Sequence, residues 1–141
     1  MRLVVADDER DTVVTLTEIL WDEGHSVYGT YKGSDVIAQV KKDRPDAVIL
    51  DIDMPGLSGY SVARELRDIF GQRTPLLIAI SGRWVGQTDK MLAELAGFNH
   101  FLQKPFDTAV LLGLLEPLRL VPPSLPGAET TIDGSSPATP T

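Results

Sequence analysis

Three short apolar runs, at residues 3–6, 47–50 and 76–80, are the strongest feature of the chain's hydrophobic pattern. No polar residue alternates with the apolar ones within these runs. We therefore expect strands that are buried on both faces, as in a parallel sheet covered by helices. Residues 26–30 and 100–102 are two weaker strand candidates. The pattern predicts five strands.

Apolar residues between these segments recur every three or four positions, which is the spacing of one helix face. The predicted stripes are Val13, Leu16 and Leu20; Val36, Ile37 and Val40; Val62, Ala63, Leu66 and Ile69; Met91, Leu92 and Leu95; and Leu111, Leu114, Leu115 and Leu118. Gly24, Pro45 and Gly97 are expected to stop three of these helices, and Asp107 to cap the fifth. Strand and helix alternate five times, which predicts an α/β domain with a doubly wound parallel sheet.

The composition changes after Val121. Residues 122–141 are rich in Pro, Ser, Thr and Gly and contain almost no bulky apolar side chain. Such a segment cannot bury enough surface to offset the entropy lost on ordering. We expect a folded domain over residues 1–121 and a disordered tail or linker over residues 122–141.

Charge and hydropathy exclude several functional classes. The formal net charge is −7 and no basic run is present, so we expect no binding to nucleic acid or to an anionic membrane. No apolar stretch approaches the roughly 20 residues that span a bilayer. The chain start lacks the regions of a signal peptide. We therefore expect a cytoplasmic protein.

Polar residues follow the predicted strands, at the ends where parallel strands present their sites. They are Asp7 and Asp8 after the first strand, Asp51 and Asp53 after the third, Ser81 after the fourth and Lys104 after the fifth. Carboxylates gathered at one edge repel one another unless a cation joins them. Oxygen ligands favour a hard ion such as Mg²⁺. A carboxylate beside a metal, a lysine and a hydroxyl suits phosphoryl transfer.

Four segments in order resemble the response-regulator receiver family of two-component signalling. They are residues 5–8 (VADD), 50–59 (LDIDMPGLSG), 80–82 (ISG) and 97–106 (GFNHFLQKPF), and the resemblance covers residues 1 to about 120. It implies a flavodoxin-like, five-stranded parallel sheet with strand order 2-1-3-4-5 and five helices. It also implies a signalling protein rather than an enzyme, one that carries phosphate on itself and removes it at most slowly.

The resemblance also implies roles for the polar residues. Asp51 would accept phosphate from a phosphohistidine on a histidine kinase or a phosphotransfer protein. Asp8 and Asp51 would ligate Mg²⁺ directly, Asp7 largely through water, and Asp53 through its backbone carbonyl. Ser81 would hydrogen-bond the phosphoryl group. Lys104, which in this family typically precedes a cis proline, would pair with it.

A switch is implied as well. The Ser81 hydroxyl would move toward the phosphate and the Phe101 ring would turn inward, which alters the face of helix four, strand five and helix five. Receivers often dimerise on this face, and the apolar fifth helix favours a homodimer or another partner there; cover by the segment from Pro122 onward is the alternative.

Phe101 replaces the Tyr of many members. Asp53 and Arg83 occupy positions that influence phosphate lifetime in receivers.

Other interpretations stay open. Asp7 and Asp8 could cap a helix, and Ser81 could simply end a strand. Residues 50–53 also resemble the Asp-x-Asp motif of haloacid-dehalogenase-type phosphatases, although the acidic pair here precedes the nucleophile. A non-phosphorylated pseudo-receiver scaffold is a further alternative. With no second functional region evident after residue 121, output would pass through protein contacts or onward phosphotransfer.

Overall fold

The computed structural model describes residues 1–73, 75–83 and 86–119. The predicted tail at 122–141 lies outside these residues. The chain forms two compact units, Met1–Asp107 and Thr108–Thr141. The first unit contains the sheet, whose strands are β1 (Arg2–Ala6), β2 (Ser26–Thr30), β3 (Ala47–Asp51), β4 (Leu76–Ser81) and β5 (His100–Gln103).

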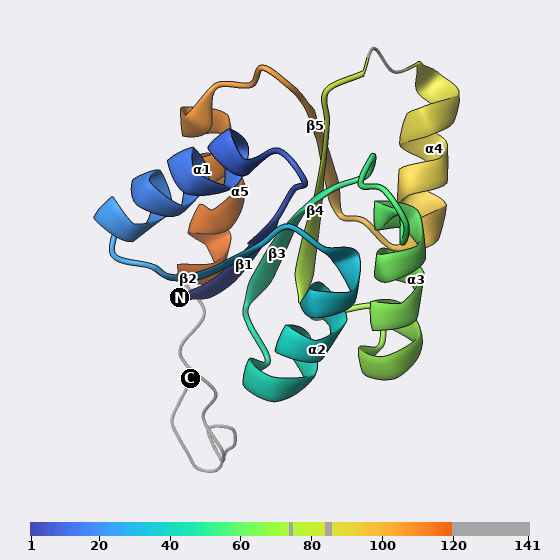
Figure 1. The fold of residues 1–141 in the computed structure, drawn as a ribbon, viewed down its shortest axis with the longest axis horizontal. Coiled ribbons are helices and arrows are strands. Elements are labelled where there is room, and N and C mark those ends of the chain that lie inside the picture. Colours follow the sequence, from blue (N-terminus) through green and yellow to red (C-terminus); the bar gives the residue numbers. More distant parts are fainter. Residues whose placement is uncertain (74, 84–85, 120–141) are drawn as a thin grey trace, which may run out of the picture. The chain divides into compact units, whose positions relative to one another are not determined.

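All neighbouring strands are parallel, and their order is β2-β1-β3-β4-β5 (Figure 1). Leu3 lies opposite Ala47, which in turn lies opposite Leu76. The three apolar runs are thus the three central strands, and nearly all their residues are buried. The two weaker candidates, β2 and β5, are the more exposed edge strands. The predicted strands, their direction and their order are confirmed.

Helices cover both faces of this sheet. The first unit contains α1 (Arg10–Asp22), α2 (Gly33–Asp43), α3 (Gly59–Phe70) and α4 (Gln87–Ala96). Helices α2, α3 and α4 share one core with alternate residues of the central strands, such as Val4, Val48 and Leu77. Helix α1 lies on the other side of the sheet, next to β1 and β2 (Figure 1). The doubly wound arrangement is confirmed within this unit.

Helix ends follow the predicted stop signals. Gly97 follows α4 with φ of 115°, a left-handed conformation that glycine adopts without steric cost. Gly24 has φ of 91° just beyond the end of α1. Helix α2 ends at Asp43, two residues before Pro45. These local signals set the lengths of the helices and hence the loops that carry the polar residues.

The predicted apolar stripe of α4 is wrong. Met91, Leu92 and Leu95 are 54%, 44% and 79% exposed, and the buried residues of this helix are Ala93 and Ala96. The helix uses its small residues toward the core, so its large ones face outward. Ile69, the last member of the α3 stripe, is also exposed.

The second unit contains α5 (Thr108–Arg119), which begins one residue after Asp107, as predicted. Leu111 and Leu115 are buried, Val110 is exposed, and Pro117 lies inside the last turn. Leu114 and Leu118 of the predicted stripe are partly exposed. Among the described residues, no helix has the length and apolar character needed to cross a membrane.

Candidate functional site

Three predicted carboxylates meet at the carboxyl edge of the sheet. Oxygen atoms of Asp7, Asp8 and Asp51 all lie within 4.8 Å of one another. Asp7 and Asp51 are buried, whereas Asp8 is exposed. The loop after β1 supplies the first two, and β3 supplies the third. The group therefore has buried charge on one side and an opening to solvent on the other.

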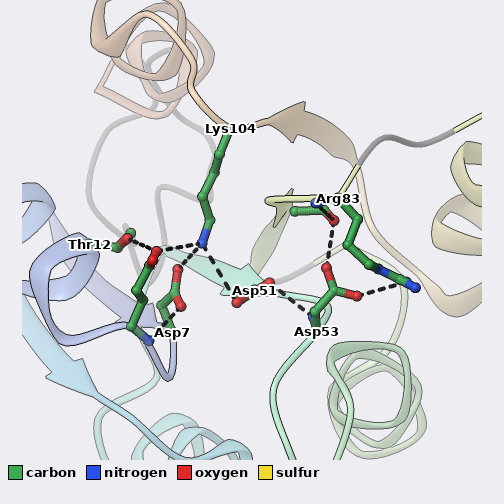
Figure 2. A network of polar contacts seen from close by, with 8 residues as sticks. Asp7, Thr12, Asp51, Asp53, Arg83 and Lys104 are labelled. Atoms are coloured by element: carbon green, nitrogen blue, oxygen red, sulfur yellow. Dashed lines mark hydrogen bonds and ion pairs between the residues drawn. The ribbon is translucent and has the colours of Figure 1, made fainter.

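Lys104 reaches into this group from the end of β5 (Figure 2). Its Nζ lies 2.6 Å from Asp7 Oδ2 and 3.7 Å from Asp51 Oδ2. The Lys104–Pro105 bond is cis, as expected. The Lys104 backbone N–H donates to the Ser81 carbonyl oxygen at 2.7 Å, which joins the ends of β5 and β4.

Glu9 is a fourth carboxylate that the sequence interpretation missed. Its Oε1 lies 3.5 Å from Lys104 Nζ and accepts a hydrogen bond from Thr12 Oγ1 at 2.9 Å. The Asp7 carboxylate in turn accepts the Glu9 backbone N–H. The position of Glu9 directly after Asp7 and Asp8 is the sequence signal that could have revealed it, because the loop after β1 lies at the same edge of the sheet.

Burial raises the pKa of Asp51 from 3.8 to about 7. The backbone N–H of Asp53, which donates to Asp51 Oδ1 at 2.9 Å, opposes this shift, the Asp7 carboxyl adds to it, and the Lys104 charge opposes it. Burial would lower the pKa of Lys104, but the hydrogen bond to Asp7 and the surrounding carboxylates outweigh burial and raise it. One lysine therefore does not offset the crowded negative charge at Asp51.

The Ser81 hydroxyl belongs to the site but points to a different carboxylate. Ser81 Oγ donates to Asp53 Oδ2 at 2.6 Å. The other oxygen of Asp53 lies 2.8 Å from Arg83 Nη2 (Figure 2). The side chain of Asp53 thus belongs to a network that the sequence did not reveal, and the predicted role of its backbone carbonyl as a Mg²⁺ ligand stays a prediction.

Phe101 lies on β5 and is partly buried against the core shared by α2, α3 and α4. It also lines a hollow of about 160 Å³ between α4 and β5, with Lys90, Ala93 and Phe98 among the other lining residues. The residue predicted to act in the switch therefore lies between the core and the surface.

The response regulator receiver domain model matches residues 3–116. The chain belongs to the response regulator receiver family. This receiver is 33% identical over 112 residues to protein PilH of Pseudomonas aeruginosa, an alignment that covers 79% of this chain and 91% of PilH. The family match assigns the chain to two-component signalling rather than to the haloacid-dehalogenase-type phosphatases.

Solved structures agree on the fold of the receiver. Chemotaxis protein CheY4 of Vibrio cholerae has a TM-score of 0.76 at 22% identity, covering 82% of this chain and 96% of that one. The BeF3-activated receiver domain of RstA from Klebsiella pneumoniae has a TM-score of 0.74 at 23% identity, covering 83% and 97%. These likenesses confirm the flavodoxin-like fold.

Proposed function

We propose that this receiver is a phosphorylation-dependent switch in which Asp51 accepts a phosphoryl group from a phosphohistidine. The donor is a histidine kinase or a phosphotransfer protein. One observation carries the proposal: a buried Asp51 carboxylate with Asp7 and Asp8 within 4.8 Å and Lys104 at 3.7 Å. Like charges held this closely are unfavourable unless a cation binds among them.

The donor set fits Mg²⁺. All available ligands are oxygens, and the exposed carboxylate of Asp8 lets a hydrated ion approach. Asp8 and Asp51 would hold the ion directly, Asp7 through water and Asp53 through its backbone carbonyl. When bound, Mg²⁺ would withdraw negative charge from the phosphoryl oxygens.

The chain's own groups supply the rest of the chemistry. A carboxylate oxygen of Asp51 attacks phosphorus, the P–N bond of the phosphohistidine breaks, and its electron pair stays on the imidazole nitrogen. The product is an acyl phosphate on Asp51. Lys104 is positioned to pair with the phosphoryl oxygens because it already contacts the neighbouring carboxylates. Ser81 donates its hydroxyl to the same oxygens.

Output would pass through α4 and β5. As the Ser81 hydroxyl turns toward the phosphate, the Phe101 ring turns inward, and the hollow that it lines between α4 and β5 changes shape. The exposed Met91, Leu92 and Leu95 on α4 support a contact with a second copy or another protein at this face. The net charge of −7 supports protein partners rather than nucleic acid.

Incubation with acetyl phosphate and Mg²⁺, followed by intact-protein mass spectrometry, tests this function. We expect one phosphoryl group per chain. No labelling is expected when a chelator replaces Mg²⁺ in the incubation, or with Asp51→Asn. Asp46→Asn is the matched control, because Asp46 precedes the same strand at its opposite end. Labelling of Asp51→Asn at the unaltered rate would refute the site. Absence of labelling in the unaltered protein would instead favour a pseudo-receiver.

A further inference from the structure

The Ser81 hydroxyl already has a strong hydrogen-bond acceptor. Ser81 is buried, and its Oγ donates to Asp53 Oδ2 at 2.6 Å, while the Arg83 backbone N–H donates to the same Oγ at 3.3 Å. A serine hydroxyl has one hydrogen to donate. A bond from a hydroxyl to a carboxylate is charge-assisted and stronger than a neutral one.

The Asp53 carboxylate is fixed in the position that receives this hydrogen. Its second oxygen pairs with Arg83 at 2.8 Å, and its own backbone N–H donates to Asp51 Oδ1 at 2.9 Å. The Asp53 side chain is 24% exposed and that of Arg83 is 68% exposed. Asp53 is thus anchored at both its backbone and its side chain, although solvent weakens the ion pair.

The Asp51 oxygens lie among other groups. Oδ1 accepts the Asp53 backbone N–H, and Oδ2 is near Lys104. Phosphoryl oxygens on Asp51 can only accept hydrogen bonds, so they and the Asp53 carboxylate require the same Ser81 hydrogen. The bond to one acceptor must break before the other forms.

We propose that the Asp53 side chain is a positioning group that competes with the phosphoryl group for the Ser81 hydroxyl, and so holds back the phosphate-bound arrangement. The inference rests on the proposed function of Asp51. Asp53 does not touch the transferred group in this account; it acts through Ser81. Removing its charge should therefore strengthen binding of a phosphoryl mimic, and most of that gain should require the Ser81 hydroxyl.

A double-mutant cycle with beryllofluoride, which mimics an acyl phosphate on a carboxylate, tests the competition. Affinity is measured by calorimetry at saturating Mg²⁺ for the unaltered protein, Asp53→Asn, Ser81→Ala and the double variant. We expect Asp53→Asn to bind about tenfold more tightly, because one charge-assisted hydrogen bond no longer opposes binding. In the Ser81→Ala background, Asp53→Asn should increase the affinity for beryllofluoride by about twofold or less.

The cycle separates competition from general electrostatic effects. Asp53→Asn also removes a negative charge and releases Arg83, but both effects act whether or not Ser81 is present. Equal factors in the two backgrounds would therefore overturn the proposal, as would weaker binding by Asp53→Asn. Asp53→Ala, which leaves no acceptor, should bind at least as tightly as Asp53→Asn, and thermal unfolding shows that each variant is folded.

A matched control is available elsewhere in the chain. Asp35 Oδ2 accepts the Thr30 hydroxyl at 3.0 Å, so Asp35→Asn removes the same charge from the same kind of bond outside the site. It should leave the affinity unchanged. If the unaltered protein bound no beryllofluoride, or if Asp51→Asn bound it equally well, the proposed function would fail and this inference with it. Binding that depends on Asp51 but not on the Asp53–Ser81 pair would overturn this inference alone.

Discussion

Two polar clusters lie at opposite ends of the strands of the sheet. At the amino ends, the buried Arg67 of α3 donates to the carbonyl oxygens of Gly97 and Pro75 at 2.9 Å, to that of Gly71 at 3.4 Å and to Asn99 Oδ1 at 2.9 Å. We call this the Arg67 cluster. Burial lowers the pKa of Arg67, yet a guanidinium stays charged in proteins. In this cluster one cation is surrounded by neutral oxygens that match its fixed fork of donors.

The carboxyl edge of the sheet, where β1, β3 and β5 end, holds the opposite arrangement. The carboxylates of Asp7, Asp8 and Asp51 lie close together. Lys104 is the shared ion-pair partner of Asp7, Asp51 and Glu9. Donors and acceptors match in the Arg67 cluster, whereas like charges remain in excess around Asp51. The first arrangement stabilises the fold by itself, whereas the second would become favourable with a bound cation, as the proposed function requires. A buried charge is therefore informative about function only when its partners leave charge unbalanced.

Removal of Arg67 should produce the largest loss of stability. Arg67→Ala leaves buried carbonyl oxygens and Asn99 without their donors, so we expect the free energy of unfolding to fall by about 4 kcal/mol. Arg67→Lys should restore little, because an ammonium cannot reproduce the fork. Denaturant unfolding measures both variants. Arg64→Ala on the exposed side of α3 is the control and should cost less than about 0.5 kcal/mol. Equal losses of stability in Arg67→Ala and Arg64→Ala would show that the Arg67 cluster does not stabilise the fold.

Removal of the Asp51 charge should increase the free energy of unfolding, in contrast to removal of Arg67. The folded protein keeps the Asp51 proton up to about pH 7, whereas the unfolded chain releases it near 3.8. The unfolded state therefore binds fewer protons between these values, and stability falls as pH rises from about 4 to about 7. Asp51→Asn has no carboxyl to ionise. It should therefore stabilise the metal-free protein by about 4 kcal/mol above pH 7, because each pH unit between 3.8 and about 7 corresponds to about 1.4 kcal/mol.

Thermal unfolding as a function of pH, with a chelator present, measures this difference. The gap between the unaltered protein and Asp51→Asn should nearly close at pH 4 and open as the pH rises. Mg²⁺ should narrow the gap at neutral pH, because a cation stabilises the unaltered carboxylate cluster. A gap that is constant with pH would mean that Asp51 carries no electrostatic cost, and the contrast with Arg67 would then be lost.

The sequence predicts the two clusters unequally. The residues of the predicted site end or directly follow strands, and parallel strands bring their carboxyl ends together, so the site follows from the order of elements. These residues are Asp7, Asp51, Ser81 and Lys104. The Arg67 cluster has no such signal, because any backbone can offer a carbonyl oxygen. Gly71 and Pro75 lie in the loop that follows α3, whereas Gly97 lies 30 residues away in sequence. The Ser81–Asp53 bond depends on side-chain rotamers, which residue order does not specify.

The same limit explains the error in α4. Periodicity shows that Met91, Leu92 and Leu95 share one side of a helix, but it does not show whether that side meets the core or a partner. Ala93 and Ala96 were overlooked because small side chains contribute little to an apolar stripe, although they allow close packing. Strand order likewise required the resemblance to receivers, since alternation of elements alone is compatible with more than one order.

The smallest expected effect tests whether neutral oxygens satisfy Arg67. Asn99 Oδ1 accepts from Arg67 Nη2 at 2.9 Å and from the Leu77 backbone N–H at 2.8 Å. Asn99→Ala removes one acceptor from both donors and should lower the free energy of unfolding by about 1 kcal/mol.

Asn99→Asp keeps the acceptor and adds a charge. If neutral partners suffice, its stability at pH 7 should lie within about 0.5 kcal/mol of the unaltered protein, because solvation lost by the new carboxylate offsets its attraction to Arg67. A gain well above that value in denaturant unfolding would show that Arg67 also lacks a counter-charge, and the two ends of the sheet would then differ in degree rather than in kind.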